Sequence, residues 1–232
     1  MRAFACLVVT GVLALGWLST AACEEKNARL DVNERFMSPA LDVDQWVGIF
    51  ESESREVFAQ RDEITRKLEL RPGIAIADIG AGTGFFVELF AELVGAEGRV
   101  YAVEVSPRFL DHLRQRARER GFRQMQVVEG SERSARLKEA SIDVAFLCDT
   151  YHHFEYPQAM LASLHRALRP GGRLVVVDFE KIEGTSQQWI LEHVRAGKQV
   201  VSAEIVSAGF TMDQQMRLDG MTENYMLQFR RP

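Results

Sequence analysis

The sequence contains few cysteines, which limits how the fold can be stabilised. Only three of its 232 residues are cysteine, at positions 6, 23 and 148. Cys6 lies in a segment that resembles a removable signal, and acylation of Cys23 would leave Cys148 as the only thiol. No internal disulfide can then form, even in an exported protein. Stability must come from a hydrophobic core, for which a hydrophobic content of 47% is sufficient.

The chain also lacks an excess of positive charge, internal repeats and, after residue 22, any apolar run long enough to span a bilayer. Its formal net charge of −5 argues against a protein that binds the phosphate backbone of nucleic acids. We therefore expect no nucleic-acid partner. The length fits one α/β domain with a short extension, and the sequence carries no signal for an oligomeric state.

The N-terminal segment is typical of a bacterial secretory signal. Residues 1–22 contain a positive residue, an apolar stretch and then Thr20-Ala-Ala22, directly before Cys23. We expect residues 1–22 to be a signal peptide, with lipidation of Cys23 favoured over ordinary cleavage or an uncleaved anchor. The domain would then be exported to the periplasm and touch a membrane only through the signal or a lipid anchor. Without processing it stays in the cytoplasm.

A glycine-rich loop follows the first predicted strand. The stretch 74–85 reads Ile-Ala-Ile-Ala-Asp-Ile-Gly-Ala-Gly-Thr-Gly-Phe, with glycines at positions 80, 82 and 84. Glycine allows positive φ and close approach of a ligand to the backbone. A second apolar strand ends at Glu104, whose carboxylate is suited to hold two ribose hydroxyls. The dinucleotide fingerprint G-x-G-x-x-G would place a small residue at Phe85, so the pattern indicates a nucleoside cofactor other than NAD.

The remaining pattern alternates strands and helices. Amphipathic spacing from Val43 predicts one or two helices before a stop at 71–73. Further elements are then expected along the chain: strands 100–104, 125–128, 142–148 and 173–179, helices 107–120 and 160–168, a turn at 169–172, and strands 209–218 and 222–229. The last two strands are expected to form an antiparallel hairpin with a reversed edge strand.

The glycine loop resembles that of class I S-adenosylmethionine (SAM)-dependent methyltransferases. Leu168-Arg-Pro-Gly-Gly172 matches their L-x-P-G-G turn, and Asp143 to His153 is similar to the fourth-strand region of quinone-biosynthesis-type enzymes. The resemblance covers roughly residues 46–232. It implies SAM as the cofactor and a Rossmann-like, doubly wound α/β sheet of seven strands with a C-terminal antiparallel hairpin. Residues 71–232 would form the SAM-binding methyltransferase domain.

Residues 23–70 are expected to form a tether and N-terminal lid helices. In the family such helices lie over the cofactor and substrate pocket, whereas Trp46 and Phe50 are individually better explained as core residues. The family often has Gly-Asp after the third strand to receive the adenine amino group. This chain has Gly130-Ser131-Glu132 instead, so Ser131 or Glu132 must serve. The resemblance assigns cofactor binding to Asp78, Gly80, Ala81, Gly82, Thr83, Gly84, Glu104, Val105, Ser131 and Cys148.

Catalysis is assigned to residues just past the fourth strand. Methyl transfer needs a nucleophile held in line and, where it carries a proton, a base. We expect His152 to be that base or to position the acceptor, with Asp149 orienting it and His153 supporting. For either histidine the alternative is capping the next helix or packing under the cofactor. No metal site is expected, because adjacent histidines rarely both point at one ion. His193 lies in a segment that closes the substrate pocket in related enzymes.

The expected function is transfer of a methyl group from SAM to a small-molecule acceptor. The alternative is an exported protein that binds SAM or a related nucleoside but has lost methyl transfer. A nicotinamide-dependent oxidoreductase is disfavoured by Phe85 and by the terminal hairpin.

Overall fold

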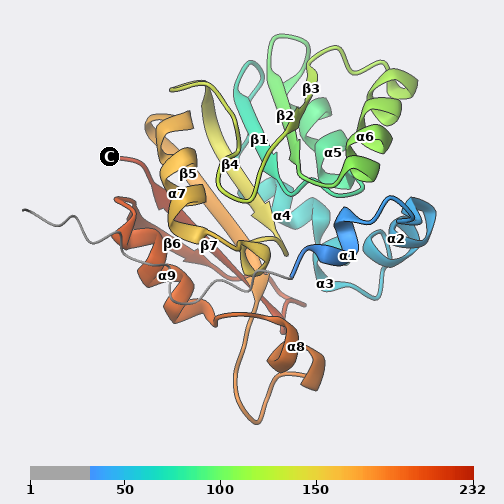
Figure 1. The fold of residues 1–232 in the computed structure, drawn as a ribbon. Helices are drawn as coiled ribbons and strands as arrows, with labels where there is room; N and C mark the ends of the chain where they lie inside the picture. The colour runs from blue at the N-terminus through green and yellow to red at the C-terminus, as the bar shows by residue number, and fades with distance from the viewer. Residues whose placement is uncertain (1–31) are drawn as a thin grey trace, which may run out of the picture.

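The structure, a computed structural model, describes residues 32–232. The predicted signal peptide and Cys23 lie outside the described residues. Seven strands form one sheet in the order β3-β2-β1-β4-β5-β7-β6, with helices on both of its faces (Figure 1). None of the helices in residues 32–232 has the length and hydrophobicity needed to cross a bilayer.

The elements follow one another as the alternating pattern predicts. The strands are β1 Ala75–Ile79, β2 Arg99–Glu104, β3 Met125–Glu129, β4 Ile142–Cys148, β5 Leu168–Phe179, β6 Thr211–Met216 and β7 Asn224–Arg230. The helices are α1 Glu34–Met37, α2 Val43–Phe50, α3 Glu56–Ala59, α4 Arg61–Lys67, α5 Phe85–Val94, α6 Pro107–Arg120, α7 Pro157–Ala167, α8 Gln188–His193 and α9 Lys198–Ser207. A short 3₁₀ helix, η1, spans Tyr151–His153.

The first five strands are parallel and form the centre of the sheet. Every residue of β1 is buried, which explains its continuous apolar sequence, because helices cover both faces of a parallel sheet. Ile79 pairs with Val103 of β2 and with Leu147 of β4. The carboxyl ends of these three strands therefore lie side by side.

Two apolar clusters hold the helices against the sheet. On one face, α4, α5 and α6 pack on the strands, and Phe146 of β4 meets Phe86 and Phe90 edge-on at 4.9 and 5.2 Å between ring centroids. On the other face, Leu161 of α7 and Ile205 of α9 are fully buried. Each helix thus buries its apolar stripe, as amphipathic helices of a layered α/β domain do.

The C-terminal hairpin is present, but its reversed strand is not at the edge. β7 runs antiparallel to both β5 and β6 and lies between them, so β6 is the edge strand. Burial explains the order: β7 is buried from Asn224 to Phe229, whereas the first five residues of β6 are exposed. The apolar sequence of β7 belongs inside the sheet, and the polar sequence of β6 suits an edge.

Several boundaries differ from the sequence prediction, and two of the differences have a local structural reason. Helix α7 begins at Pro157, three residues before the predicted start, because proline is favourable in a helix's first turn. The predicted turn 169–172 lies within β5 as an irregular segment: Ile142 pairs with Leu168, and Val144 pairs with Arg173.

Candidate functional site

A cavity of about 850 Å³ lies at the carboxyl ends of β1, β2, β4 and β5. The strand order reverses between β1 and β4, which is where open α/β sheets bind ligands. Segments of α1 to α3 and of α8 close it from the other side. The predicted cofactor and catalytic residues that line it are Asp78, Gly80, Ala81, Gly82, Thr83, Glu104, Val105, Ser131, Cys148, Asp149, His152 and His153.

The glycine loop leads from β1 into α5. Gly80 has φ +72°, and a Cβ there would lie 2.4 Å from Cγ2 of Thr150, so only glycine fits. Gly84 also has positive φ, but it is outside the cavity lining, and a Cβ there would lie 2.6 Å from the Leu113 side chain. Gly84 therefore lets α5 pack closely against α6, and its contact with the cofactor stays a prediction.

Glu104 is fixed in the cavity by backbone amides. Gly82 N donates to Oε2 at 2.9 Å, while Val105 N and Ser106 N donate to Oε1 at 2.7 and 2.9 Å. A carboxylate accepts about four hydrogen bonds, so Oε2 keeps capacity for a ligand hydroxyl. Burial raises the pKa of Glu104, and these three amides act in the opposite direction.

Asp78, at the end of β1, is buried beside Glu104. Burial first, and the charge of Glu104 second, raise the pKa of Asp78 to about 8. Because the amides favour the ionised form of Glu104, the proton that the pair retains at neutral pH resides on Asp78. The cavity thus holds one carboxylate and one carboxylic acid side by side.

The His152 ring is held by Asp178, not by Asp149 as the sequence predicted. Nδ1 of His152 lies 2.7 Å from Oδ1 of Asp178, and the backbone amide of His152 donates to Oδ2 at 3.1 Å. A carboxylate only accepts, so Nδ1 is the donor and Nε2 is the ring nitrogen left for another group. Asp178 lies in β5, the neighbour of β4 in the sheet, and this neighbour is what orients the ring.

Asp149 instead ties the N-terminal helices to the sheet. Its carboxylate accepts from Arg55 at 2.5 Å and from Asn224 of β7 at 2.7 Å. Arg55 also donates to the carbonyl of Phe50, whose ring lies 3.6 Å from a Cβ built on Gly82. The segment around α2 therefore covers the glycine loop, and Phe50 and Trp46 both line the cavity.

Ser131, after β3, and Cys148, at the end of β4, also line the cavity. The Ser131 amide donates to the carbonyl of Ser134 at 2.9 Å, which fixes the loop after β3. Burial first, and the charge of Asp149 second, raise the pKa of the Cys148 thiol well above its usual value. A thiol with a raised pKa is a weaker nucleophile at neutral pH, which argues against a nucleophilic role for Cys148.

Comparison with known proteins agrees with this geometry. Residues 77–176 match the methyltransferase domain family. An uncharacterized 37.1 kDa protein of transposon TN4556 from Streptomyces fradiae is 32% identical over 151 residues, 65% of this chain and 43% of that protein. The ubiquinone/menaquinone biosynthesis C-methyltransferase UbiE of Shewanella sp. strain ANA-3 is 29% identical over 112 residues, 48% of this chain and 45% of UbiE. The chain thus spans less than half the length of these relatives.

Solved structures establish the architecture. A SAM-dependent methyltransferase from Aquifex aeolicus superposes with a TM-score of 0.72 at 20% identity, covering 82% of this chain and 98% of that one. The chain has the methyltransferase fold. The [4+2]-cyclase SpnF shares it, with a TM-score of 0.64 at 18% identity over 74% of this chain and 80% of SpnF. The methyltransferase domain and its structural neighbours support SAM as the cofactor.

The methyltransferase fold divides the cavity into two ends. The glycine loop and Glu104 form the end that the sequence assigned to the cofactor. The other end contains His152 and His153 of η1 with Phe179, Trp189 and His193. Sequence reasoning missed Asp178 and did not place His193 beside the other histidines. The signal that could have found Asp178 is its position: it is an acidic residue near the end of a buried strand, next to the strand that leads to His152.

Proposed function

We propose that this protein transfers the methyl group of SAM to a small-molecule acceptor. The observation that carries the proposal is the Glu104 carboxylate, held by three backbone amides beside a glycine loop in a cavity of about 850 Å³. Such a carboxylate can accept the two ribose hydroxyls of a nucleoside, while the loop leaves room for the methionyl part. The cavity volume lies within the usual range for small-ligand sites, about 300–1,000 Å³.

The acceptor is proposed to occupy the end of the cavity that contains the histidines. Phe179 and Trp189 pack edge-on there at 4.9 Å, and His152 lies 5.6 Å from the Phe179 ring. These aromatic walls fit an apolar or aromatic acceptor. His152, with Nδ1 bound to Asp178, presents Nε2 as a base or as a group that positions the acceptor.

Calorimetric titration of the full chain with SAM, S-adenosylhomocysteine and NAD tests cofactor binding. We expect micromolar binding of both SAM compounds, about −8 kcal/mol, and none of NAD. Gly82→Arg should abolish it by filling the space under Phe50. Gly121→Arg is the matched control: it also has positive φ, but no atom lies within 4 Å of its Cβ position. Failure of the full chain to bind SAM would refute the proposal.

Turnover separates an enzyme from a binding protein that has lost methyl transfer. SAM labelled in its methyl group would be incubated with the chain and a panel of phenols, thiols, amines and quinols. Release of S-adenosylhomocysteine together with a labelled product supports transfer. Tight SAM binding without product across the panel supports the binding-protein alternative, which is compatible with a fold that the cyclase SpnF also uses.

We also propose that the domain is exported, on the basis of the sequence of residues 1–22 and Cys23. Fractionation of bacteria that express the full chain tests this. The wild-type chain should appear with the membranes, and Cys23→Ser should move to the soluble periplasm. A chain that stays in the cytoplasm in both forms would contradict export.

A further inference from the structure

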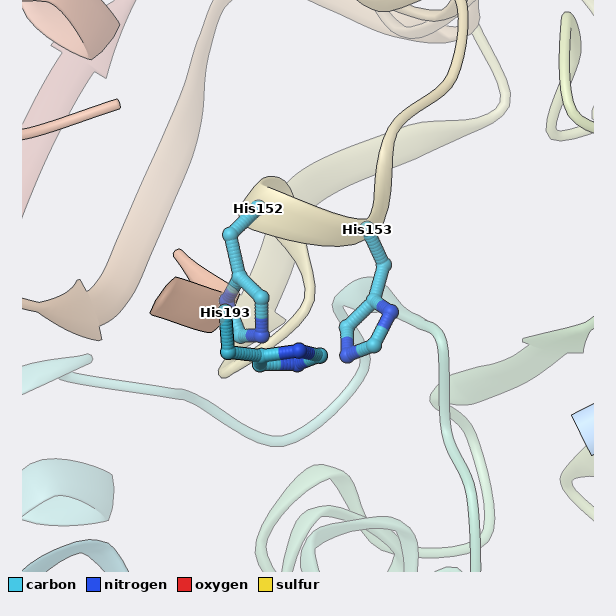
Figure 2. A group of neighbouring side chains, drawn as sticks. All are labelled: His152, His153 and His193. Carbon is cyan, nitrogen blue, oxygen red and sulfur yellow. The ribbon is translucent and has the colours of Figure 1, made fainter. Parts of the chain in front are cut away.

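Three histidines from two separate elements converge at one end of the cavity. His152 and His153 come from η1, and His193 is the last residue of α8. One ring nitrogen from each lies within 4.8 Å of the other two, and the ring centroids are 4.3, 5.0 and 5.1 Å apart. Figure 2 shows the three rings gathered around one space. Adjacent histidines rarely point to one place, and here the 3₁₀ turn makes them do so.

A carboxylate behind the cluster fixes one of the rings. Asp178 accepts a hydrogen bond from Nδ1 of His152. It also accepts hydrogen bonds from the backbone amides of His152 and Phe179, which hold the carboxylate in place. This leaves Nε2 of His152 as the nitrogen available for another partner. A carboxylate that holds the far nitrogen of a histidine is the arrangement found behind metal-binding histidines, where it fixes the ring and raises its basicity.

The His153 ring packs against the other two histidines and against Phe36. Its Nδ1 is buried and has no hydrogen-bond partner among the described residues. Figure 2 shows this nitrogen on the side of the ring away from His193, whereas the other ring nitrogen, Nε2, lies toward His193. Aromatic rings on either side, Phe36 at 5.5 Å from His153 and Phe179, limit access of water.

We propose that His152, His153 and His193 bind a divalent transition-metal ion, and that its fourth position opens into the cavity. Imidazole nitrogens favour zinc, copper, nickel and iron, and three histidines with one open position form a known type of catalytic zinc site. A tetrahedral ion about 2.0–2.1 Å from each nitrogen separates the nitrogens by about 3.3 Å. The ring nitrogens already lie within 4.8 Å of one another, so binding of the ion would require them to approach by about 1.5 Å.

The ion would take an anionic oxygen or sulfur of a small molecule as its fourth ligand, because all three histidines line the same cavity. This inference goes beyond the proposed function, since ion binding requires no methyl transfer. With the ion in place, Nε2 of His152 becomes a ligand. The charge of the ion would then lower the pKa of a bound hydroxyl or thiol, whose proton would leave to water, so the step would not need a free imidazole.

Titration of the chelator-treated full chain with Zn²⁺, and separately with Co²⁺, tests the site. We expect one ion per chain with a dissociation constant in the micromolar range or below. His153→Ala and His193→Ala should each weaken binding by about 100-fold or more, and Asp178→Asn by about 10- to 100-fold. His165→Ala is the matched control, because His165 packs on Phe210 and lies outside the cavity lining.

The wild-type titration decides the proposal even if a variant does not fold. Absence of saturable one-to-one binding by the wild-type chain would overturn it. So would unchanged binding in His153→Ala and His193→Ala variants that keep the circular dichroism spectrum and melting transition of the wild type. A thiolate-to-cobalt absorption band would assign the ion to cysteines and would also overturn it. Because SAM binding is measured separately, failure of the metal site and failure of the proposed function are distinguishable.

Discussion

Replacement of Asp78 by asparagine should stabilise the protein in the absence of ligand, increasingly so as the pH rises. The pKa of Asp78 is raised from 3.8 to about 8 in the folded state, first by burial and then by Glu104. Between these values the folded state holds a proton that the unfolded chain has released. The contribution of Asp78 to stability is therefore fully present below pH 3.8 and is lost as the pH rises toward 8. Asparagine has no such dependence.

The size of the effect follows from the pKa. Each pH unit in this window costs the wild type about 1.4 kcal/mol of unfolding free energy relative to Asp78→Asn. From about pH 5 to about pH 7 the difference between the two proteins should therefore grow by roughly 3 kcal/mol. Burial of the asparagine amide adds a cost that does not depend on pH. It changes the free-energy difference by the same amount at both pH values, so the increase from about pH 5 to about pH 7 stays the same.

Urea unfolding of the full chain at several pH values measures the difference. The matched control is Asp111→Asn, an exposed carboxylate of α6 paired with Arg114. For this control we expect a change of no more than about 0.5 kcal/mol at every pH. A difference for Asp78→Asn that does not change between about pH 5 and about pH 7 would refute the reasoning that Asp78 is protonated in the folded protein.

Three further substitutions test other parts of the site and core. Arg55→Ala removes the ion-pair partner of the buried Asp149. Calorimetry should show S-adenosylhomocysteine binding weakened roughly tenfold, about 1.4 kcal/mol. Unchanged affinity would show that the Arg55–Asp149 pair does not hold the N-terminal helices over the cavity. Asp178→Asn should lower kcat for methyl transfer by about 100-fold or more, while the affinity for S-adenosylhomocysteine stays within about twofold of the wild type. An equal loss of kcat and of affinity would point to a structural role for Asp178. Phe146→Ala should cost about 3–5 kcal/mol in urea unfolding, and a loss below about 1 kcal/mol would contradict its place in the core.

The fold and the cofactor end of the cavity could be predicted because their signals are local. Each of these signals is adjacent in sequence to the structure that it indicates. They are the apolar run before Asp78, the spaced glycines of the loop, and the acidic residue at the end of β2. Parallel strands bring their carboxyl ends together, so the sequence alone was enough to place Asp78 and Glu104 in one site. The seven-stranded sheet with its C-terminal hairpin was predicted and is confirmed.

The histidine end could not be predicted to the same depth, because its contacts are distant in sequence. His152 and Asp178 are 26 residues apart and meet only because β4 and β5 pair. Asp149 is closer to His152 along the chain, but its positive φ of +48° accompanies bonds to Arg55 and Asn224 instead. Proximity in sequence was therefore a poor guide to which carboxylate orients the ring.

The two ends of the cavity differ in how they are built, and this bears on what the fold can do. The cofactor end depends on glycine conformation and backbone amides, which few substitutions could preserve. The other end depends on side chains from η1, α8 and the N-terminal helices, which can change without disturbing the sheet. One fold can therefore host different reactions, as the shared architecture of a methyltransferase and the cyclase SpnF shows. For this protein, we therefore propose that the chemistry be sought in His152, His153 and His193, whose convergence is a property of these side chains and not of the fold.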